Sequence, residues 1–179
     1  MPNPTYMKNQ IHLEWRMRGI LVDWLIEVHA KFRLLPETLF LCVNIIDRFL
    51  SVRPVAMEKL QLVGVTALLI ASKYEEVLAP AISAFLYIAD GGYTDDEILK
   101  AERYMLNIIG FDLAYPNPIN FLRRISKADD YDIRTRTIAK YLVEISLVDD
   151  RFLKYTPSIV AAAGMYLSRE MMDRGPWVT

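Results

Sequence analysis

The sequence is poor in the residues on which catalytic and metal sites depend. Its 179 residues include one cysteine, Cys42, and two histidines, His12 and His29. Cys42 lies in an apolar stretch with no metal ligand beside it, so we expect a small core residue. Neither histidine has the spacing of a zinc site or of a catalytic triad, and no glycine-rich phosphate loop is present. The sequence therefore predicts a protein that is not an enzyme, with no metal and no cofactor.

The chain also lacks an excess of charge and a long apolar run. Its formal net charge is -1, whereas a nucleic-acid-binding domain usually carries a basic excess, so we expect no nucleic-acid partner. The longest apolar run, residues 60–72, is shorter than the ~20 residues that span a bilayer, so we expect no membrane partner. The first ten residues are polar and unlike a secretory signal, which predicts an intracellular protein.

Apolar residues recur mainly at helical spacing, and 53% of the chain is hydrophobic. We find no strand or hairpin pattern, so the predicted fold class is all-α. The third helix is apolar almost all round, which is typical of the centre of a bundle. Thr94 and Glu97 predict a capping box at the start of the fifth. The expected helices span residues 14–33, 36–50, 57–76, 82–89, 94–110, 117–127, 133–148 and 157–172.

A double-proline segment, residues 115–118 (YPNP), predicts a domain boundary. A short repeat relates the two sides of this boundary. The four letters DRFL occur at residues 47–50 and again at residues 150–153, each time before a helix rich in small and apolar residues. One such match is a weak indication of two related halves.

The first predicted helix carries two apolar stripes, although a surface helix needs one. One stripe can face the core, which leaves the other either buried under a second element or exposed to a partner. The pattern alone favours burial of both. Two charges, Arg18 and Asp47, lie in apolar surroundings and need partners if they are buried. The first stripe contains Met17, Ile20, Leu21, Trp24 and Val28, and the second Val22, Leu25 and Ile26.

Several segments of the chain resemble one known family. Residues 17–25 (MRGILVDWL) and residues 71–76 (ASKYEE) resemble the two signatures of the cyclin box. Residues 115–124 (YPNPINFLRR) resemble mitotic B-type cyclins of fungal character. The resemblance covers nearly the whole chain in order, continuing through residues 44–50 (NIIDRFL), residues 59–64 (KLQLVG), Glu102 and residues 111–113 (FDL).

The resemblance implies a cyclin-box helical bundle. We expect an extension over residues 1–13, one complete five-helix repeat over residues 14–113 and a truncated second repeat of about three helices over residues 114–179. Apolar side chains that a longer second repeat would cover, those of Ile159, Val160 and Met165, are then expected to be exposed. The resemblance also implies that Arg18 and Asp47 form a buried structural ion pair.

The function implied is that of a regulatory subunit. It binds and activates a mitotic cyclin-dependent kinase at the G2/M transition, in the nucleus and cytoplasm. In the family, the end of the third helix and the fifth helix grip the kinase C-helix. Lys73 and Glu102 are the charged anchors, which we expect to be exposed. The implied contact residues are Ile70, Lys73, Tyr74, Glu102, Leu106, Phe111 and Leu113.

The resemblance also gives the first stripe a role as a docking patch for Arg-x-Leu type peptides of substrates and inhibitors. This reverses what the pattern alone favours. The alternative is a cyclin-fold module of the transcription-factor or adaptor type that does not activate a kinase, although the charge of -1 argues against DNA binding. The implied patch consists of Met17, Ile20, Leu21, Trp24, Glu27, Leu60 and Gln61.

Overall fold

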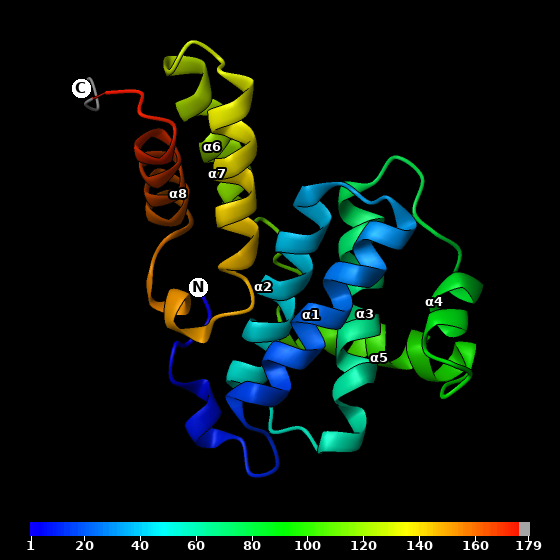
Figure 1. The fold of residues 1–179 in the computed structure, drawn as a ribbon. Coiled ribbons are helices and arrows are strands. Elements are labelled where there is room, and N and C mark those ends of the chain that lie inside the picture. Colours follow the sequence, from blue (N-terminus) through cyan, green and yellow to red (C-terminus); the bar gives the residue numbers. More distant parts are fainter. Residues whose placement is uncertain (176–179) are drawn as a thin grey trace. The chain divides into compact units, whose positions relative to one another are not determined.

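The computed structural model describes residues 1–175, and all regular structure in that range is helical (Figure 1). The all-α fold class is thus confirmed. The chain divides into two compact units, Met1–Tyr115 and Pro116–Thr179. Unit 1 holds the α-helices α1 (Trp15–Phe32), α2 (Pro36–Val52), α3 (Leu60–Glu75), α4 (Ile82–Ile88) and α5 (Asp95–Ile108) and the short 3-10 helices η1 (Tyr6–Asn9) and η2 (Met57–Lys59).

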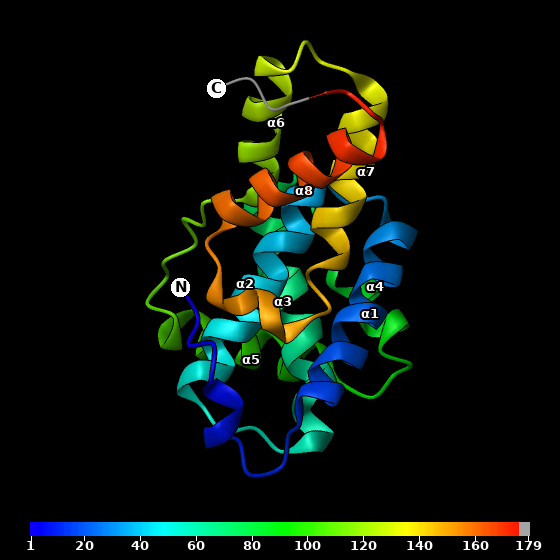
Figure 2. The ribbon, with the colours of Figure 1, turned by 60° about the vertical axis from the view of Figure 1, so that its left-hand side comes forward.

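Helix α3 forms the centre of unit 1. It packs against each of the other four α-helices of that unit (Figure 2). Every residue from Val63 to Ser72 is buried. Gly64 permits the close approach of α1, because a Cβ atom at this position would lie 2.7 Å from Cδ1 of Leu21.

Local sequence signals determine where several helices begin. Pro36 occupies the first turn of α2, where its missing N–H costs nothing. The predicted capping box of α5 is confirmed: the Glu97 backbone N–H donates to the Thr94 hydroxyl over 3.3 Å, and the Thr94 N–H donates to the Glu97 carboxylate over 2.9 Å. The Thr94 N–H and hydroxyl, which both donate to the Glu97 carboxylate, lower the pKa of Glu97. None of the helices in residues 1–175 is long and apolar enough to cross a bilayer.

The first residues of the chain pack onto α2. Gln10 is buried, and its side-chain amide donates to the carbonyl oxygens of Leu50 and Arg53, each over 2.7 Å. The amide oxygen of Gln10 accepts the N–H of Val55 over 2.9 Å. These bonds satisfy backbone groups at the end of α2 that have no partner within the helix. The sequence pattern did not reveal this role, because one glutamine in a polar segment has no periodicity.

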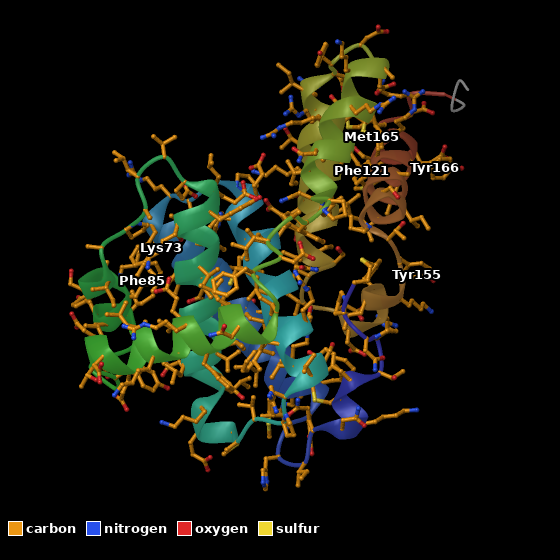
Figure 3. All side chains as sticks on the ribbon, turned by 180° about the vertical axis from the view of Figure 1, so that it is seen from behind. Lys73, Phe85, Phe121, Tyr155, Met165 and Tyr166 are labelled. Atoms are coloured by element: carbon orange, nitrogen blue, oxygen red, sulfur yellow. The ribbon has the colours of Figure 1, made fainter. Side chains whose placement is uncertain are left out.

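Unit 2 is a bundle of three helices, α6 (Pro118–Ala128), α7 (Ile133–Ile145) and α8 (Pro157–Met171), with the 3-10 helix η3 (Asp150–Lys154) between the last two. Leu122 and Met165 lie in its buried core, with Phe121 packed against them (Figure 3). The expected exposure of Met165 is therefore wrong, because three helices are enough to enclose one face of α8. Ile159 on another face of α8 is half exposed, as expected.

Candidate protein-binding sites

A buried ion pair connects α1 to α2. Arg18 and Asp47, the residues that the resemblance pairs, meet in a two-point contact: Nε to Oδ1 over 2.7 Å and Nη2 to Oδ2 over 2.8 Å. Both side chains are 2% exposed. Burial alone would lower the pKa of Arg18, but the Asp47 carboxylate raises it, so the guanidinium stays charged. Removing one partner of such a pair typically costs about 3–5 kcal/mol.

Tyr6 completes this cluster, and sequence reasoning missed it. Its hydroxyl donates to Oδ1 of Asp47 over 2.8 Å, and its ring meets Trp15 edge-on at 4.9 Å. Burial raises the pKa of Tyr6, and the Asp47 carboxylate raises it further, so the phenol keeps the proton that it donates. A tyrosine near the chain end carries no local signal of such a contact. The cluster fixes the position of α1 and therefore the direction of its outer face.

The two predicted charged anchors contact each other. Nζ of Lys73, near the end of α3, lies 2.7 Å from Oε1 of Glu102 on α5. The Lys73 side chain is 49% exposed, whereas that of Glu102 is 12% exposed. The expectation that both are exposed is therefore wrong for Glu102, because it lies on the face of α5 that packs against α3. Lys73 itself extends from the end of α3 (Figure 3).

The segment after α5 is held in an unusual backbone conformation. Gly110 and Phe111 both have positive φ, +68° and +56°, and a positive φ is uncommon for a residue with a side chain. The Phe111 N–H donates to the Leu106 carbonyl oxygen over 2.9 Å. Arg48 of α2 donates to the carbonyl oxygens of Asp112 over 2.7 Å and Ile109 over 3.2 Å. Arg48 thus holds the segment in place, and the Phe111 ring remains largely exposed.

The predicted kinase-contact residues differ in exposure. Tyr74 and Phe111 are exposed, and Leu106 and Leu113 are half-buried. Ile70 is buried, so it supports the surface from below. Lys73 and Glu102 join the end of α3 to α5, and Leu106 lies one turn beyond Glu102. Unit 1 therefore presents a mixed face, the α3–α5 face, with one partly exposed ion pair between aromatic and aliphatic side chains.

The predicted docking residues line a hollow of about 300 Å³ between α1 and α3, the α1–α3 groove. Leu21 and Leu60 are buried at its base, and Ile20 is 61% exposed at its edge. Glu27 does not line this groove; it lines a larger hollow of about 810 Å³ with Lys31. The residues that line the groove are Met17, Ile20, Leu21, Trp24, Met57, Leu60 and Gln61.

The two stripes of α1 have different environments. Val22 and Leu25 of the second stripe are fully buried, whereas Ile20 of the first is exposed and Trp24 is half-buried. The burial of both stripes, which the pattern alone favours, is therefore wrong. Met57 was missed, although its spacing of three from Leu60 places it on the same side.

Cys42 is a fully buried core residue, as expected, and burial raises the pKa of its thiol.

The sequence matches two protein families, one for each unit. Residues 1–114 match the family described as "Cyclin, N-terminal domain". Residues 116–179 match the family described as "Cyclin, C-terminal domain". Between them, the two matches cover nearly every residue of the chain.

Named relatives agree with these matches. The chain is 68% identical to the G2/mitotic-specific cyclin cdc13 of Schizosaccharomyces pombe and 64% identical to the G2/mitotic-specific cyclin-B of Emericella nidulans. Each alignment covers 99% of this chain and 37% of the relative. The chain therefore spans little more than a third of the length of these relatives.

Solved structures show the same fold. A viral cyclin from herpesvirus saimiri superposes with a TM-score of 0.85 at 22% identity, over 94% of this chain and 75% of that one. A chain of the yeast RNA Pol II CTD kinase CTDK-1 complex superposes with a TM-score of 0.81 at 15% identity, over 97% of this chain and 61% of that one. At such identities the likeness establishes the fold alone.

Proposed function

Because this chain belongs to the cyclin family, with both cyclin domains matched and the G2/mitotic-specific cyclins of fungi among its relatives, we propose that it binds and activates a cyclin-dependent kinase of the mitotic type. It contributes no catalytic group and acts in G2/M control, in the nucleus and cytoplasm. One solved structure with this fold belongs to a kinase complex, which supports a kinase as the partner.

The α3–α5 face is the observation that carries this proposal. To bind the C-helix of a kinase, a surface needs apolar contact area and a charge that fixes the register of the helix. Tyr74 and Phe111 offer exposed aromatic area, and Lys73 offers a cation whose partner, Glu102, holds it in place. Arg48 keeps Phe111 positioned before the partner arrives, which lowers the entropy lost on binding.

Activation then follows from position. A protein kinase is active when the glutamate of its C-helix pairs with the lysine of strand β3. The α3–α5 face holds the kinase C-helix inward, so that this pair forms before substrate binds. Only the active state of the kinase, with its C-helix inward, makes these contacts. Binding therefore shifts the kinase population toward the active state.

The test is to remove both charges of the face. Lys73→Ala with Glu102→Ala leaves neither partner unpaired, so we expect the helical circular dichroism to persist. Binding to a purified mitotic cyclin-dependent kinase should weaken at least about thirty-fold, because desolvated charged contacts are worth about 2–5 kcal/mol. Histone phosphorylation by the complex should fall in parallel.

A matched control lies on the same helix. Lys100 and Asp96 form an ion pair on α5 with both side chains 70% exposed, so Lys100→Ala with Asp96→Ala should leave kinase binding unchanged. The exchange variant Lys73→Glu with Glu102→Lys keeps the internal pair but reverses its charges, and it should fail to bind. Normal activation by this exchange variant would remove the face from the mechanism. Binding without activation would instead identify an adaptor.

We further propose that the α1–α3 groove receives Arg-x-Leu type docking peptides. Its apolar base and exposed edge suit an aliphatic side chain. Glu27 lies about one helical turn beyond Trp24 on α1, outside the groove, where its carboxylate can attract a basic residue of the peptide. Ile20→Ala with Trp24→Ala should weaken an Arg-x-Leu peptide by ten-fold or more, since central aromatic anchors are worth about 2 kcal/mol. Val52→Ala, at a residue with the same 61% exposure as Ile20, is the control and should have no effect.

A further inference from the structure

A third hollow in unit 1, of about 290 Å³, opens between α2, α3 and α5. It shares no lining residue with the α1–α3 groove, and none of the α3–α5 face residues named above lines it. Its volume is at the lower end of the range for ligand pockets, so it has room for one large side chain and not for a whole helix. We call it the α2–α5 pocket.

The walls of the α2–α5 pocket are apolar and preformed. Phe49 and Tyr104 meet edge-on, with ring centroids 5.9 Å apart. Val63 and Met105 are buried behind them. An aromatic guest is favoured here, because aromatic rings gain from edge-on contacts beyond the area that they bury.

One lining residue has a buried polar group without a partner. Thr66 is fully buried on α3, and its hydroxyl has no hydrogen-bond partner among residues 1–175. Buried hydroxyl groups are normally paired, since an unpaired one is destabilising. A guest that brings a hydroxyl to this position supplies the missing partner.

The rim of the α2–α5 pocket is positively charged. Arg53 and Lys59 line it, and none of the acidic residues among residues 1–175 does. The Arg53 guanidinium lies 6.0 Å from the centroid of the Tyr104 ring. Glu97 on α5 interacts electrostatically with Lys59 from outside the pocket, but it is already bound to Thr94. The rim therefore favours a guest with negative charge beside its apolar part.

From these features we propose that the α2–α5 pocket binds a tyrosine side chain within an acidic peptide segment. The ring lies between the apolar walls, its hydroxyl pairs with that of Thr66, and neighbouring carboxylates meet Arg53 and Lys59. This is a second peptide site of unit 1, selective for acidic partners. It does not depend on kinase binding or on the α1–α3 groove.

The first experiment measures binding of fluorescent pentapeptides to the full chain. The probe has a central tyrosine between two pairs of aspartates, and matched peptides replace the aspartates by lysine or the tyrosine by phenylalanine. We expect the acidic tyrosine peptide to bind, the lysine peptide to fail, and phenylalanine to weaken binding about five-fold through loss of one hydrogen bond. Arg53→Gln with Lys59→Gln, both exposed positions, should weaken the acidic peptide about ten-fold or more.

The second experiment tests the place of binding. Thr66→Val should abolish the preference for tyrosine over phenylalanine while binding of the phenylalanine peptide persists. The methyl resonance of Met105 should shift on titration, whereas that of Met57, in the α1–α3 groove, should not. Equal binding of the lysine peptide, a tyrosine preference that survives Thr66→Val, competition by inorganic phosphate as effective as that by the peptide, or a shift of Met57 instead of Met105 would each overturn the proposal.

Discussion

Residues 47–50 and residues 150–153 have the same sequence, DRFL, but different structures. The first segment lies inside α2, where Asp47 is buried between Arg18 and Tyr6. The second forms most of the 3-10 helix η3, and no residue of that helix is buried. Phe49 is 5% exposed, whereas Phe152 is 40% exposed.

The two arginines show the same contrast. Arg48 reaches more than sixty residues along the chain, to the carbonyl oxygens of Ile109 and Asp112. Arg151 instead bonds to Asp149, only two residues before it. The same side chain therefore holds the distant segment beside Phe111 in one case and closes a local turn in the other. The contribution of each residue to stability is determined by the distant residues that it contacts, and the four-residue sequence DRFL does not specify those contacts.

The largest expected effect comes from the two aspartates. Asp47→Asn leaves the Arg18 charge buried without its counter-charge and should lower the free energy of unfolding by about 3–5 kcal/mol. Asp150→Asn, at the equivalent position of the second segment, should change it by less than about 0.5 kcal/mol. Urea unfolding followed by circular dichroism measures both. Equal losses would mean that the ion pair adds nothing specific.

The phenylalanines should differ somewhat less. Phe49→Ala removes a buried ring and leaves a cavity beside Tyr104, at a cost of about 3 kcal/mol. Phe152→Ala removes a ring that contacts Tyr155 at 6.4 Å in an exposed turn, and should cost less than about 1 kcal/mol. Thermal melts of the two variants provide the comparison, which a larger shift for Phe152→Ala would contradict.

The arginines should separate stability from binding. Arg48→Ala removes hydrogen bonds to two carbonyl oxygens and should cost about 1–2 kcal/mol. It should also weaken kinase binding, because Phe111 loses its support. Arg151→Ala breaks an exposed local pair and should alter neither quantity measurably. Kinase pull-down and melting temperature, measured on both variants, test this; undiminished kinase binding by Arg48→Ala would show that Phe111 needs no such support.

The last comparison concerns the rate at which a thiol in each segment reacts. Cys42 lies on α2 before the first DRFL segment, fully buried and with a raised pKa. It should therefore react with a thiol reagent only when α2 opens. A reporter in the second segment, Phe152→Cys in a Cys42→Ser background, should react at once in the folded protein. Fast labelling of the native Cys42 would mean that α2 opens locally.

Much of the fold could be predicted because its signals are local. Periodicity located the helices to within a few residues, and the letters around Thr94 identified the capping box that the structure contains. The apolar character of the third helix indicated that it lies at the centre of the bundle, which is where the structure places α3. These properties depend on residues three or four positions apart, which a single sequence displays.

The rest depends on contacts between distant residues. No periodicity connects Tyr6 to Asp47 or Arg48 to Asp112, and the pairing of Lys73 with Glu102 becomes visible only when α3 and α5 cross. Similarly, the exposure expected for Met165 was wrong because α6 and α7 cover it. The resemblance supplied the predicted contact residues, but only the structure shows which of them are exposed and which are buried.

The Tyr6 hydroxyl also affects how the molecule opens. Its bond to Asp47 joins residues 41 positions apart, and Gln10 holds the same segment to the end of α2. If residues 6–10 detach from α2, the buried Asp47 carboxylate therefore loses the hydrogen bond that the Tyr6 hydroxyl donates. Chain ends usually exchange their amide hydrogens quickly. Here the beginning of the chain should share the slow exchange of the helix that it contacts, so that the two unfold as a single cooperative unit.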